Sequence, residues 1–145
     1  MATPTKYVLD TGILIRELRG DSRAATLMDR LSSAGEVLAS AMTAFEIYRG
    51  CRTLQEEWAT SDLFERVALL DVTLQVAGTA ARLMREHPGI FSSDRAAADA
   101  LIAGAAITSD TVLVTLNARQ FSRGGITGLR AMVLDQNAPD WDISS

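Results

Sequence analysis

Five short apolar runs, separated for the most part by segments with helical spacing, constrain the fold of this 145-residue chain more than any other feature. The runs are Tyr7–Leu9, Val37–Ala39, Val67–Leu70, Val112–Thr115 and Ala131–Leu134. They are apolar throughout instead of alternating, which is typical of strands in a parallel sheet that helices cover on both faces. The alternation of strands and helices therefore predicts a three-layer α/β sandwich with right-handed crossovers.

Segments with helix-compatible spacing fill most of the room between these runs. The predicted helices are Ile13–Leu18, Ala24–Leu31, Thr43–Arg49, Leu54–Phe64, Leu74–Glu86 and Ala96–Ile107. His87, followed by proline and glycine, marks the end of the fifth helix. A glycine pair leaves room for only a short turn between Asn117 and Leu129. Since no repeat, linker or low-complexity segment is present, we expect a single domain over residues 1–145, with Asn137–Ser145 as a terminal extension.

The composition limits the class of protein. Of all residues, 48% are hydrophobic and 22% are charged, which favours a compact domain over a disordered chain. The net charge of −4 gives no reason to expect nonspecific nucleic-acid binding, although a bound divalent cation would reverse the local sign of an acidic site. The single cysteine, Cys51, suits a reducing compartment. Without an apolar signal core or a run long enough to span a membrane, a cytoplasmic protein with no membrane contact is expected.

Three acids and one amide fall where the predicted strands end. Asp10 follows the first strand directly, and Glu46 lies in the first turns of the helix after the second strand. Asp99 lies near the start of the alanine-rich sixth helix, and Asn117 follows the fourth strand. Because ligands of an open parallel sheet bind outside the carboxyl ends of its strands, we expect these side chains to converge.

Each acid also has an ordinary structural explanation. Asp10 can cap the helix after it, and Glu46 completes a capping-box pattern with Thr43. Asp99 can favour a helix N-terminus or pair with Arg95. However, Glu46 and Asp99 have apolar surroundings, where a carboxylate is costly unless a cation neutralises it. Together the acids indicate an oxygen-rich site for Mg²⁺ or Mn²⁺, which can activate a water for attack on a phosphodiester.

Four blocks of the sequence resemble those of PIN-domain ribonucleases, in the same order and at similar spacing. The blocks are Val8–Ile15, Ser40–Ile47, Asp99–Ala103 and Leu113–Phe121. The length and single-domain build are similar to VapC toxins of bacterial and archaeal toxin–antitoxin pairs. The resemblance implies a sheet ordered 3-2-1-4-5, a metal-dependent endoribonuclease acting on RNA, a homodimer, and inhibition by a small VapB-type antitoxin.

The resemblance also implies roles for individual residues. The metal-binding acids of the family correspond to Asp10, Glu46 and Asp99, its accessory hydroxyls to Thr11 and Thr43, and the polar residue after its fourth strand to Asn117. One departure is Gln120, which stands where the family usually has Asp. An amide keeps an oxygen ligand but loses a charge, so binding of a second cation should be weaker. Asp110 does not replace that acid, because strand geometry puts it about 16 Å from the far end of the fourth strand. Asp135 follows the fifth strand at roughly 10 Å from Asp10, so it is expected to be a turn residue instead of a ligand.

Arginines and aromatic residues near the site blocks have two possible roles each. The arginines that could rim an RNA-binding edge are Arg16, Arg49 and Arg119, with their neighbours Arg19, Arg52 and Arg123. They could equally be ordinary surface residues that pair with nearby acids.

The apolar candidates for a dimer face or an antitoxin groove are Ile13–Ile15, Phe45, Tyr48, Trp58 and Phe64. Most of these are expected in the core.

The sequence allows three alternatives to a ribonuclease to be considered. A phosphate-accepting receiver domain would carry paired acids before the first strand and a Lys after the fifth, and neither is present. A haloacid-dehalogenase-type phosphatase needs an Asp-x-Asp motif, whereas Gly12 stands two residues after Asp10. A PIN fold that lost activity through Gln120, and that only binds an antitoxin or RNA, stays open. Cleavage of RNA with and without divalent ions separates this module from an enzyme.

Overall fold

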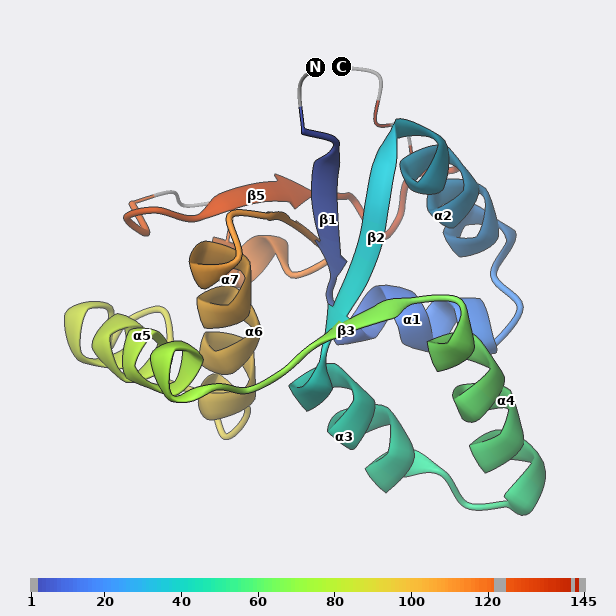
Figure 1. Cartoon of the computed structure of the whole chain (residues 1–145), viewed down its shortest axis with the longest axis horizontal. Helices are drawn as coiled ribbons and strands as arrows, with labels where there is room; N and C mark the ends of the chain where they lie inside the picture. The colour runs from blue at the N-terminus through green and yellow to red at the C-terminus, as the bar shows by residue number, and fades with distance from the viewer. Residues whose placement is uncertain (1–2, 122–124, 142, 144–145) are drawn as a thin grey trace.

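All five predicted strands form, and they pair in parallel in the order β3-β2-β1-β4-β5 (Figure 1). The computed structural model describes residues 3–121, 125–141 and 143. Within these residues the strands are β1 (Thr5–Leu9), β2 (Gly35–Ser40), β3 (Ala68–Leu70), β4 (Val112–Thr115) and β5 (Arg130–Val133). The predicted α/β fold and the sheet order are confirmed, and the predicted strand ends are at most two residues away from the observed ones.

Seven helices lie within the same described residues. They are α1 (Thr11–Leu18), α2 (Ser22–Ala34), α3 (Ala41–Gly50), α4 (Leu54–Glu65), α5 (Leu74–Glu86), α6 (Ala96–Thr108) and α7 (Ala118–Phe121). The first six occupy the predicted segments, and α7 is the short turn expected after the fourth strand. As predicted, α5 ends at His87, whose backbone N–H donates to the carbonyl of Leu83 at 2.9 Å. None of the helices in the described part of the chain is long and apolar enough to cross a membrane.

Successive residues of the central strands point to opposite faces of the sheet, and each face has its own core. Val8 belongs to the core formed with α5 and α6, whereas Leu9 belongs to the core formed with α1 and α2. Leu113 and Val114 of β4 divide in the same way. Figure 1 shows α5 and α6 on one side of the sheet and α1 and α2 on the other. The predicted three-layer sandwich is therefore present.

The edge strands are less covered than the apolar runs predicted. In β3, Ala68 and Leu69 are exposed, and β5 begins with the exposed Arg130 and Ala131. By contrast, the last residues of β1, β2 and β4 are buried. The expectation of burial on both faces was therefore wrong for the two edges, because the helical layers lie mainly over the three central strands.

Small residues bring α6 close to α5 and so fix the helix that carries Asp99. A Cβ added at Gly104 would lie 3.1 Å from the carbonyl oxygen of Val76 and 3.2 Å from the backbone nitrogen of Ala80. Such contacts are tighter than ordinary van der Waals packing, so the close approach of the two helices needs glycine at this position. The alanine-rich helix therefore packs closely against α5.

The burial of several aromatic residues differs from what the sequence predicted. Trp141, in the segment expected to be a terminal extension, is 1% exposed and packs in the core with α1 and α2. Conversely, Phe45, Tyr48 and Trp58 are 55%, 42% and 60% exposed, so their expected place in the core was wrong. Figure 1 shows the reason: α3 and α4 extend beyond the carboxyl edge of the sheet. Phe64 is partly buried against the core, as expected.

Candidate active site

Asp10 lies at the junction of β1 and α1, where both the sheet and the helix fix its position. Its backbone N–H donates to the carbonyl of Val114 on β4 at 2.9 Å. Its Oδ1 accepts from the N–H of Thr11 at 2.8 Å, so Asp10 caps α1, as one interpretation of the sequence proposed. Its Oδ2 accepts from the hydroxyl of Thr115 at 2.6 Å. With only 8% of its surface exposed, Asp10 is held by the fold itself.

Thr115 is a residue of this site that the sequence analysis missed. It is the last residue of β4 and is fully buried. Its hydroxyl donates to Asp10 and accepts from the backbone N–H of Asn117 at 3.0 Å. Thr115 therefore links the first and fourth sequence blocks. The available signal was a hydroxyl side chain at the carboxyl end of a strand predicted to lie beside β1.

A pair of threonines connects Glu46 to the end of β1. The hydroxyl of Thr11 donates to Oε1 of Glu46 at 2.7 Å, and it lies 3.0 Å from the hydroxyl oxygen of Thr43. Thr43 is fully buried, whereas Glu46 is partly exposed. The capping-box explanation of Glu46 is wrong, because the N-cap of α3 is Ser40 and Thr43 already lies inside the helix. Both predicted accessory hydroxyls therefore lie beside a predicted acid.

Asp99 lies in the first turn of α6 and is partly exposed. Burial raises the pKa of Asp99 to about 6, and the negative charge of Asp10 contributes to the rise. The side-chain amide of Gln120 lowers this pKa, the charge of Glu46 raises it, and Arg95 lowers it. Arg95 therefore changes the pKa of Asp99 less than the neighbouring acids and the amide of Gln120 do.

The three acids are electrostatically coupled although they come from three different helices or helix ends. Burial raises the pKa of Asp10 above its ordinary value, the hydrogen bonds from Thr115 and Thr11 lower it, and the charge of Glu46 raises it. Asp10 and Glu46 also both raise the pKa of Asp99. The structure therefore brings Asp10, Glu46 and Asp99 into one electrostatic environment, in which the charge of Glu46 disfavours ionisation of both aspartates and that of Asp10 disfavours ionisation of Asp99.

The chemistry of this set fits a divalent cation. Carboxylate oxygens are the preferred ligands of Mg²⁺ and Mn²⁺, and a cation would offset the mutual repulsion of the acids. Both oxygens of Asp10 keep acceptor capacity after each has accepted one hydrogen bond. Within residues 3–121, 125–141 and 143, however, no three acidic, histidine or cysteine side chains are close enough together to hold a metal ion. The shared ligand shell of Asp10, Glu46 and Asp99 therefore stays a prediction.

Gln120 is engaged in hydrogen bonds within the protein. Its Oε1 accepts from the side-chain amide of Asn117 at 2.9 Å, and its Nε2 donates to the carbonyl of Ile90 at 3.3 Å. The backbone N–H of Gln120 donates in turn to Oδ1 of Asn117 at 3.2 Å. Gln120 is 8% exposed and lies beside Asp99. It therefore ties α7 to the loop before α6 and fixes Asn117.

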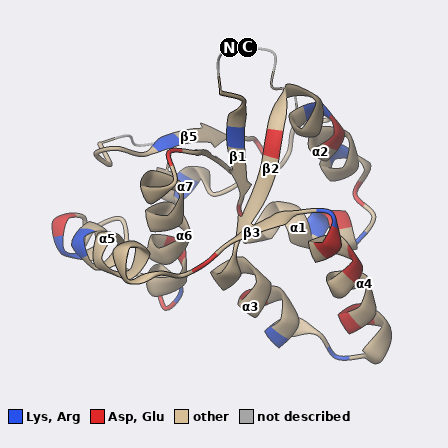
Figure 2. Ribbon diagram, viewed as in Figure 1, with Lys and Arg blue, Asp and Glu red and all other residues tan. Residues whose placement is uncertain are grey.

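The predicted RNA-binding arginines have different surroundings. Arg119 lines a pocket together with Asp99. Arg16 instead forms an ion pair of 3.5 Å with the N-cap residue of α2, and Arg49 lies 5.8 Å from the centre of an aromatic ring on its own helix. Arg123 lies outside the described residues. Figure 2 shows basic and acidic positions interspersed on α1, α2 and α5. Of the predicted set, Arg119 lines the pocket of Asp99, and Arg19 and Arg52 line a hollow together with Glu46.

Two hollows flank the acids. One has a volume of about 300 Å³ and is lined by Asp99, Asn117, Arg119 and Gln120, with residues of the loop before α6. The other has a volume of about 610 Å³, lies between α1, α3 and α4, and is lined in part by Glu46. Since Asp10 is coupled to the acid at each hollow, an extended ligand that occupied both would pass over the carboxyl end of β1.

Comparisons with known proteins agree with this fold and arrangement of acids. The family model of the PIN domain matches residues 7–126. Ribonuclease VapC19 of Mycobacterium tuberculosis strain H37Rv is 37% identical over 119 residues, which cover 79% of this chain and 90% of that protein. The chain therefore belongs to the PIN-domain family and, within it, to the VapC ribonucleases. Membership of this family implies dependence on a divalent cation.

Solved structures show the same fold. The structure of VapBC2 from Rickettsia felis, bound to a DNA fragment from its promoter, matches with a TM-score of 0.75 at 20% identity. That match covers 90% of this chain and 100% of the other. VapBC-1 from nontypeable Haemophilus influenzae matches with a TM-score of 0.72 at 25% identity, over 89% of this chain and 98% of the other. The sheet order and layers described above are thus those of the VapC structures.

Proposed function

We propose that this chain is the toxin of a VapBC-type pair, a Mg²⁺-dependent endoribonuclease that hydrolyses phosphodiester bonds of RNA in the cytoplasm. The observation that carries the proposal is the electrostatic coupling of Asp10, Glu46 and Asp99 at the carboxyl edge of a parallel sheet. A relative that is 37% identical bears the name of a ribonuclease, which supports the same activity here. The hollows on either side of the acids suit an extended substrate such as a single RNA strand.

The acids would hold the cation, with Mn²⁺ as an alternative to Mg²⁺. A cation bound there supplies a polarised phosphoryl oxygen and an activated water for in-line attack. Asp10 is the central ligand in this proposal because the fold fixes its carboxylate before anything binds. Glu46 and Asp99 are partly exposed and can adjust around the ion.

Neighbouring polar side chains orient the acids and the substrate. The hydroxyls of Thr115 and Thr11 direct the carboxylates of Asp10 and Glu46. Outer contacts of this kind commonly fix the geometry of ligating carboxylates. Asn117, held by Gln120, presents an amide at the mouth of the Asp99 pocket, where Arg119 can meet a phosphate.

An RNA cleavage assay tests the proposal. Purified chain, free of any antitoxin, should cut single-stranded RNA with Mg²⁺ or Mn²⁺ and not in EDTA. Asp10→Asn and Asp99→Asn should both lose cleavage and bind Mn²⁺ more weakly in calorimetry. Asp29→Asn, an exposed acid on α2, is the matched control and should behave like the wild type. Absence of cleavage, or its survival in both site variants, would leave the inactive binding module as the function.

We also propose a VapB-type antitoxin as the partner, bound over the hollow between α1, α3 and α4. Structural neighbours that match this fold were solved as VapBC complexes. The hollow contains the apolar Ile15, Leu18 and Ile47, and the exposed Trp58 lies on the same helix, α4, that forms one wall. Such a surface can receive the apolar face of an amphipathic helix. A small protein encoded beside this gene should bind the chain and stop cleavage, and Trp58→Ala should weaken that inhibition.

A homodimer is the proposed assembly. Leu69, Val72 and Leu74 are 45%, 43% and 90% exposed along the β3–α5 edge, which supplies apolar surface for a second copy. Light scattering should give twice the chain mass of 15.6 kDa for the wild type. Leu74→Glu should reduce this value to that of a monomer.

A further inference from the structure

A third hollow, a groove, begins at Asn117 and leads toward the segment after β5. It has a volume of about 570 Å³, and its walls are formed by α7, the carboxyl ends of β4 and β5, and the turn after β5. Asn117 and Arg119 line both this groove and the pocket of Asp99. The groove therefore adjoins the pocket of Asp99 and leads from it toward the turn Asp135–Asn137.

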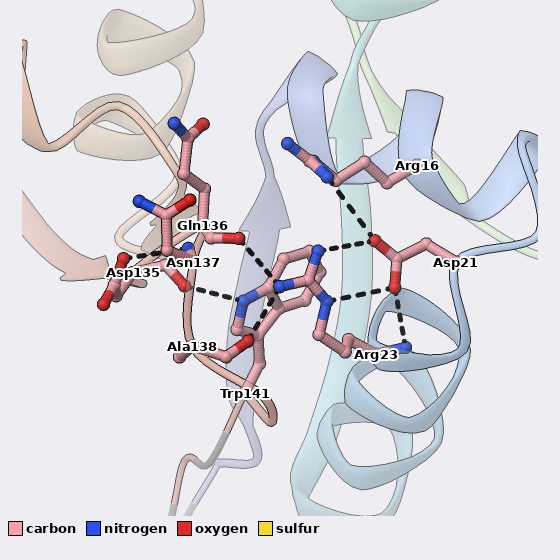
Figure 3. A network of polar contacts seen from close by, with 8 residues as sticks. All are labelled: Arg16, Asp21, Arg23, Asp135, Gln136, Asn137, Ala138 and Trp141. Atoms are coloured by element: carbon pink, nitrogen blue, oxygen red, sulfur yellow. Dashed lines mark hydrogen bonds and ion pairs between the residues drawn. The ribbon is translucent and has the colours of Figure 1, made fainter.

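The turn Asp135–Asn137 forms the far wall of this groove with three exposed polar side chains. Oδ1 of Asp135 accepts from the backbone N–H of Asn137 at 2.9 Å, which confirms the turn role expected for this acid. Figure 3 shows the side-chain amides of Gln136 and Asn137 directed away from the guanidinium of Arg23. The polar groups of the turn are thus presented outward, while its backbone is held from the other side.

Arg23 of α2 holds the backbone of this turn. Its Nη1 donates to the carbonyls of Gln136 at 2.7 Å and Ala138 at 2.8 Å. Its guanidinium lies 4.5 Å from the centre of the Trp141 ring, and Nε1 of Trp141 donates to the carbonyl of Asp135 at 3.0 Å (Figure 3). Three carbonyls of the segment after β5 are therefore fixed by two side chains.

Asp21 fixes the orientation of Arg23 in turn. Nε and Nη2 of Arg23 donate to the two carboxylate oxygens of Asp21 at 3.1 and 2.8 Å. These hydrogen bonds lower the pKa of Asp21 to about 2, so the pair is ionised at neutral pH. A planar guanidinium with two-pronged contacts on one side and a ring on its face has little freedom to move. We call Asp21, Arg23 and Trp141 the tail clamp.

We propose that the turn Asp135–Asn137 recognises one base of single-stranded RNA beside the scissile phosphate, and that the tail clamp holds the turn in position for this. The inference rests on the proposed ribonuclease function. On the near wall, Arg119 offers a positive charge to the RNA backbone. The far wall offers a carboxylate, which repels phosphate, and two amides. Both kinds of group match the hydrogen-bonding edges of bases.

The chemistry of Asp135 further selects the base. An ionised carboxylate only accepts hydrogen bonds, so it favours a base edge with an amino group over that of uracil, whose single N3–H donor lies between two carbonyls that repel the carboxylate. Adenine, cytosine and guanine carry such an amino group. The turn should therefore discriminate against uracil at the position that it contacts.

Short single-stranded RNAs that differ only in the base beside the mapped cleavage site test the turn. Wild type should show a higher kcat/KM for adenine than for uracil, and Asp135→Asn should reduce this ratio about fivefold, the worth of one hydrogen bond. Because the amide of the variant can donate to a uracil carbonyl, the same change should raise the rate on the uracil substrate. An unchanged ratio in both Asp135→Asn and Asn137→Ala overturns the inference.

The same RNAs also separate this inference from the proposed function. If wild type cuts none of them, the ribonuclease assignment fails. The ratio of their dissociation constants, measured by fluorescence anisotropy in EDTA, then still reports whether the turn distinguishes bases. Equal constants for the adenine and uracil RNAs in the wild type overturn the base-recognition proposal independently of cleavage.

Arg23→Lys tests the clamp, because an ammonium cannot reproduce the planar contacts of the guanidinium. This variant should lower the adenine-to-uracil ratio while the rate on the uracil substrate is kept. Arg30→Lys is the matched control, since Nη1 of Arg30 contacts the carbonyl of Trp141 and the side chain of Asp140 but not the turn. A purely structural clamp would instead change the melting temperature, or all rates equally, without changing the ratio.

Discussion

Asp10 and its two partner acids are positioned by different means. Asp10 is buried, continues the pairing of β1 with β4, and accepts a hydrogen bond on each carboxylate oxygen. Glu46 and Asp99 lie on α3 and α6, are partly exposed, and are steadied by a hydroxyl and an amide respectively. The candidate site therefore has one rigid acid and two adjustable ones.

This difference between the acids explains how the site can have a defined position although its three carboxylates do not yet form a ligand shell. The rigid acid marks the position of the cation, and the adjustable acids can complete the shell by rotating side chains without moving the sheet. Burial of an ionised carboxylate is unfavourable, so the rigid acid should also reduce the stability of the metal-free fold. Activity and stability are therefore expected to respond in opposite directions at Asp10.

The largest effect is expected for Asp10→Asn. Cleavage should fall by about a thousandfold, because several kcal/mol of charge stabilisation in the transition state is lost. The melting temperature of the metal-free protein should rise, since the raised pKa of Asp10 shows that burial disfavours the charge. Calorimetric melting in EDTA and a cleavage assay check the two halves. A lower melting temperature would contradict the view that the buried charge opposes folding.

Thr115→Val should have the next largest effect. The change removes the hydroxyl that orients Asp10 and leaves the N–H of Asn117 without its partner. Loss of an outer contact of this type costs about 10- to 100-fold in metal affinity or activity. Thr111→Val is the matched control, because Thr111 is equally buried and its hydroxyl bonds the carbonyl of Ala106 instead. Similar rates for the two variants would show that Thr115 is only structural.

A smaller effect is expected for Thr11→Val, which removes the hydroxyl beside Glu46. Because Glu46 is an adjustable acid, it should still reach a cation, with a loss of roughly tenfold or less in affinity. Titration of Mn²⁺ followed by calorimetry measures the change. If Thr11→Val weakens Mn²⁺ binding more than Thr115→Val does, the distinction between a rigid and an adjustable acid is wrong.

The sequence predicted the strands and most helices because apolar runs and helical spacing are local signals. The position of Asp10 at the carboxyl end of the first strand followed from the same local signals, because it comes directly after an apolar run. Thr115 was missed although the resemblance implied that β4 lies beside β1, because the sequence does not show which acceptor the hydroxyl at the end of β4 would reach. Trp141 was missed for a related reason: its partner Arg23 is more than a hundred residues away in the chain.

Gln120 shows a different limit of sequence reasoning. The residue was correctly singled out because it departs from the pattern of the family, and the loss of a charge was the consequence considered. The structure shows a contact that composition cannot reveal: the amide bonds Asn117 and the carbonyl of Ile90 at once. A carboxylate could accept from Asn117 but could not donate to Ile90, so the amide has a bond that the usual acid lacks.

The smallest expected effect is the pH dependence of stability at Asp99. Its pKa is raised in the folded protein from 3.8 to about 6, so protonation favours the fold. The stabilisation from Asp99 is therefore complete below about pH 4 and is lost as the pH rises through about 6. In EDTA, the melting temperature of wild type should fall relative to that of Asp99→Asn as the pH rises across this range. Added Mg²⁺ should reduce this fall in melting temperature, because a cation favours the ionised carboxylate. If the difference in melting temperature between the two proteins stays constant with pH, Asp99 does not titrate as one of the coupled acids.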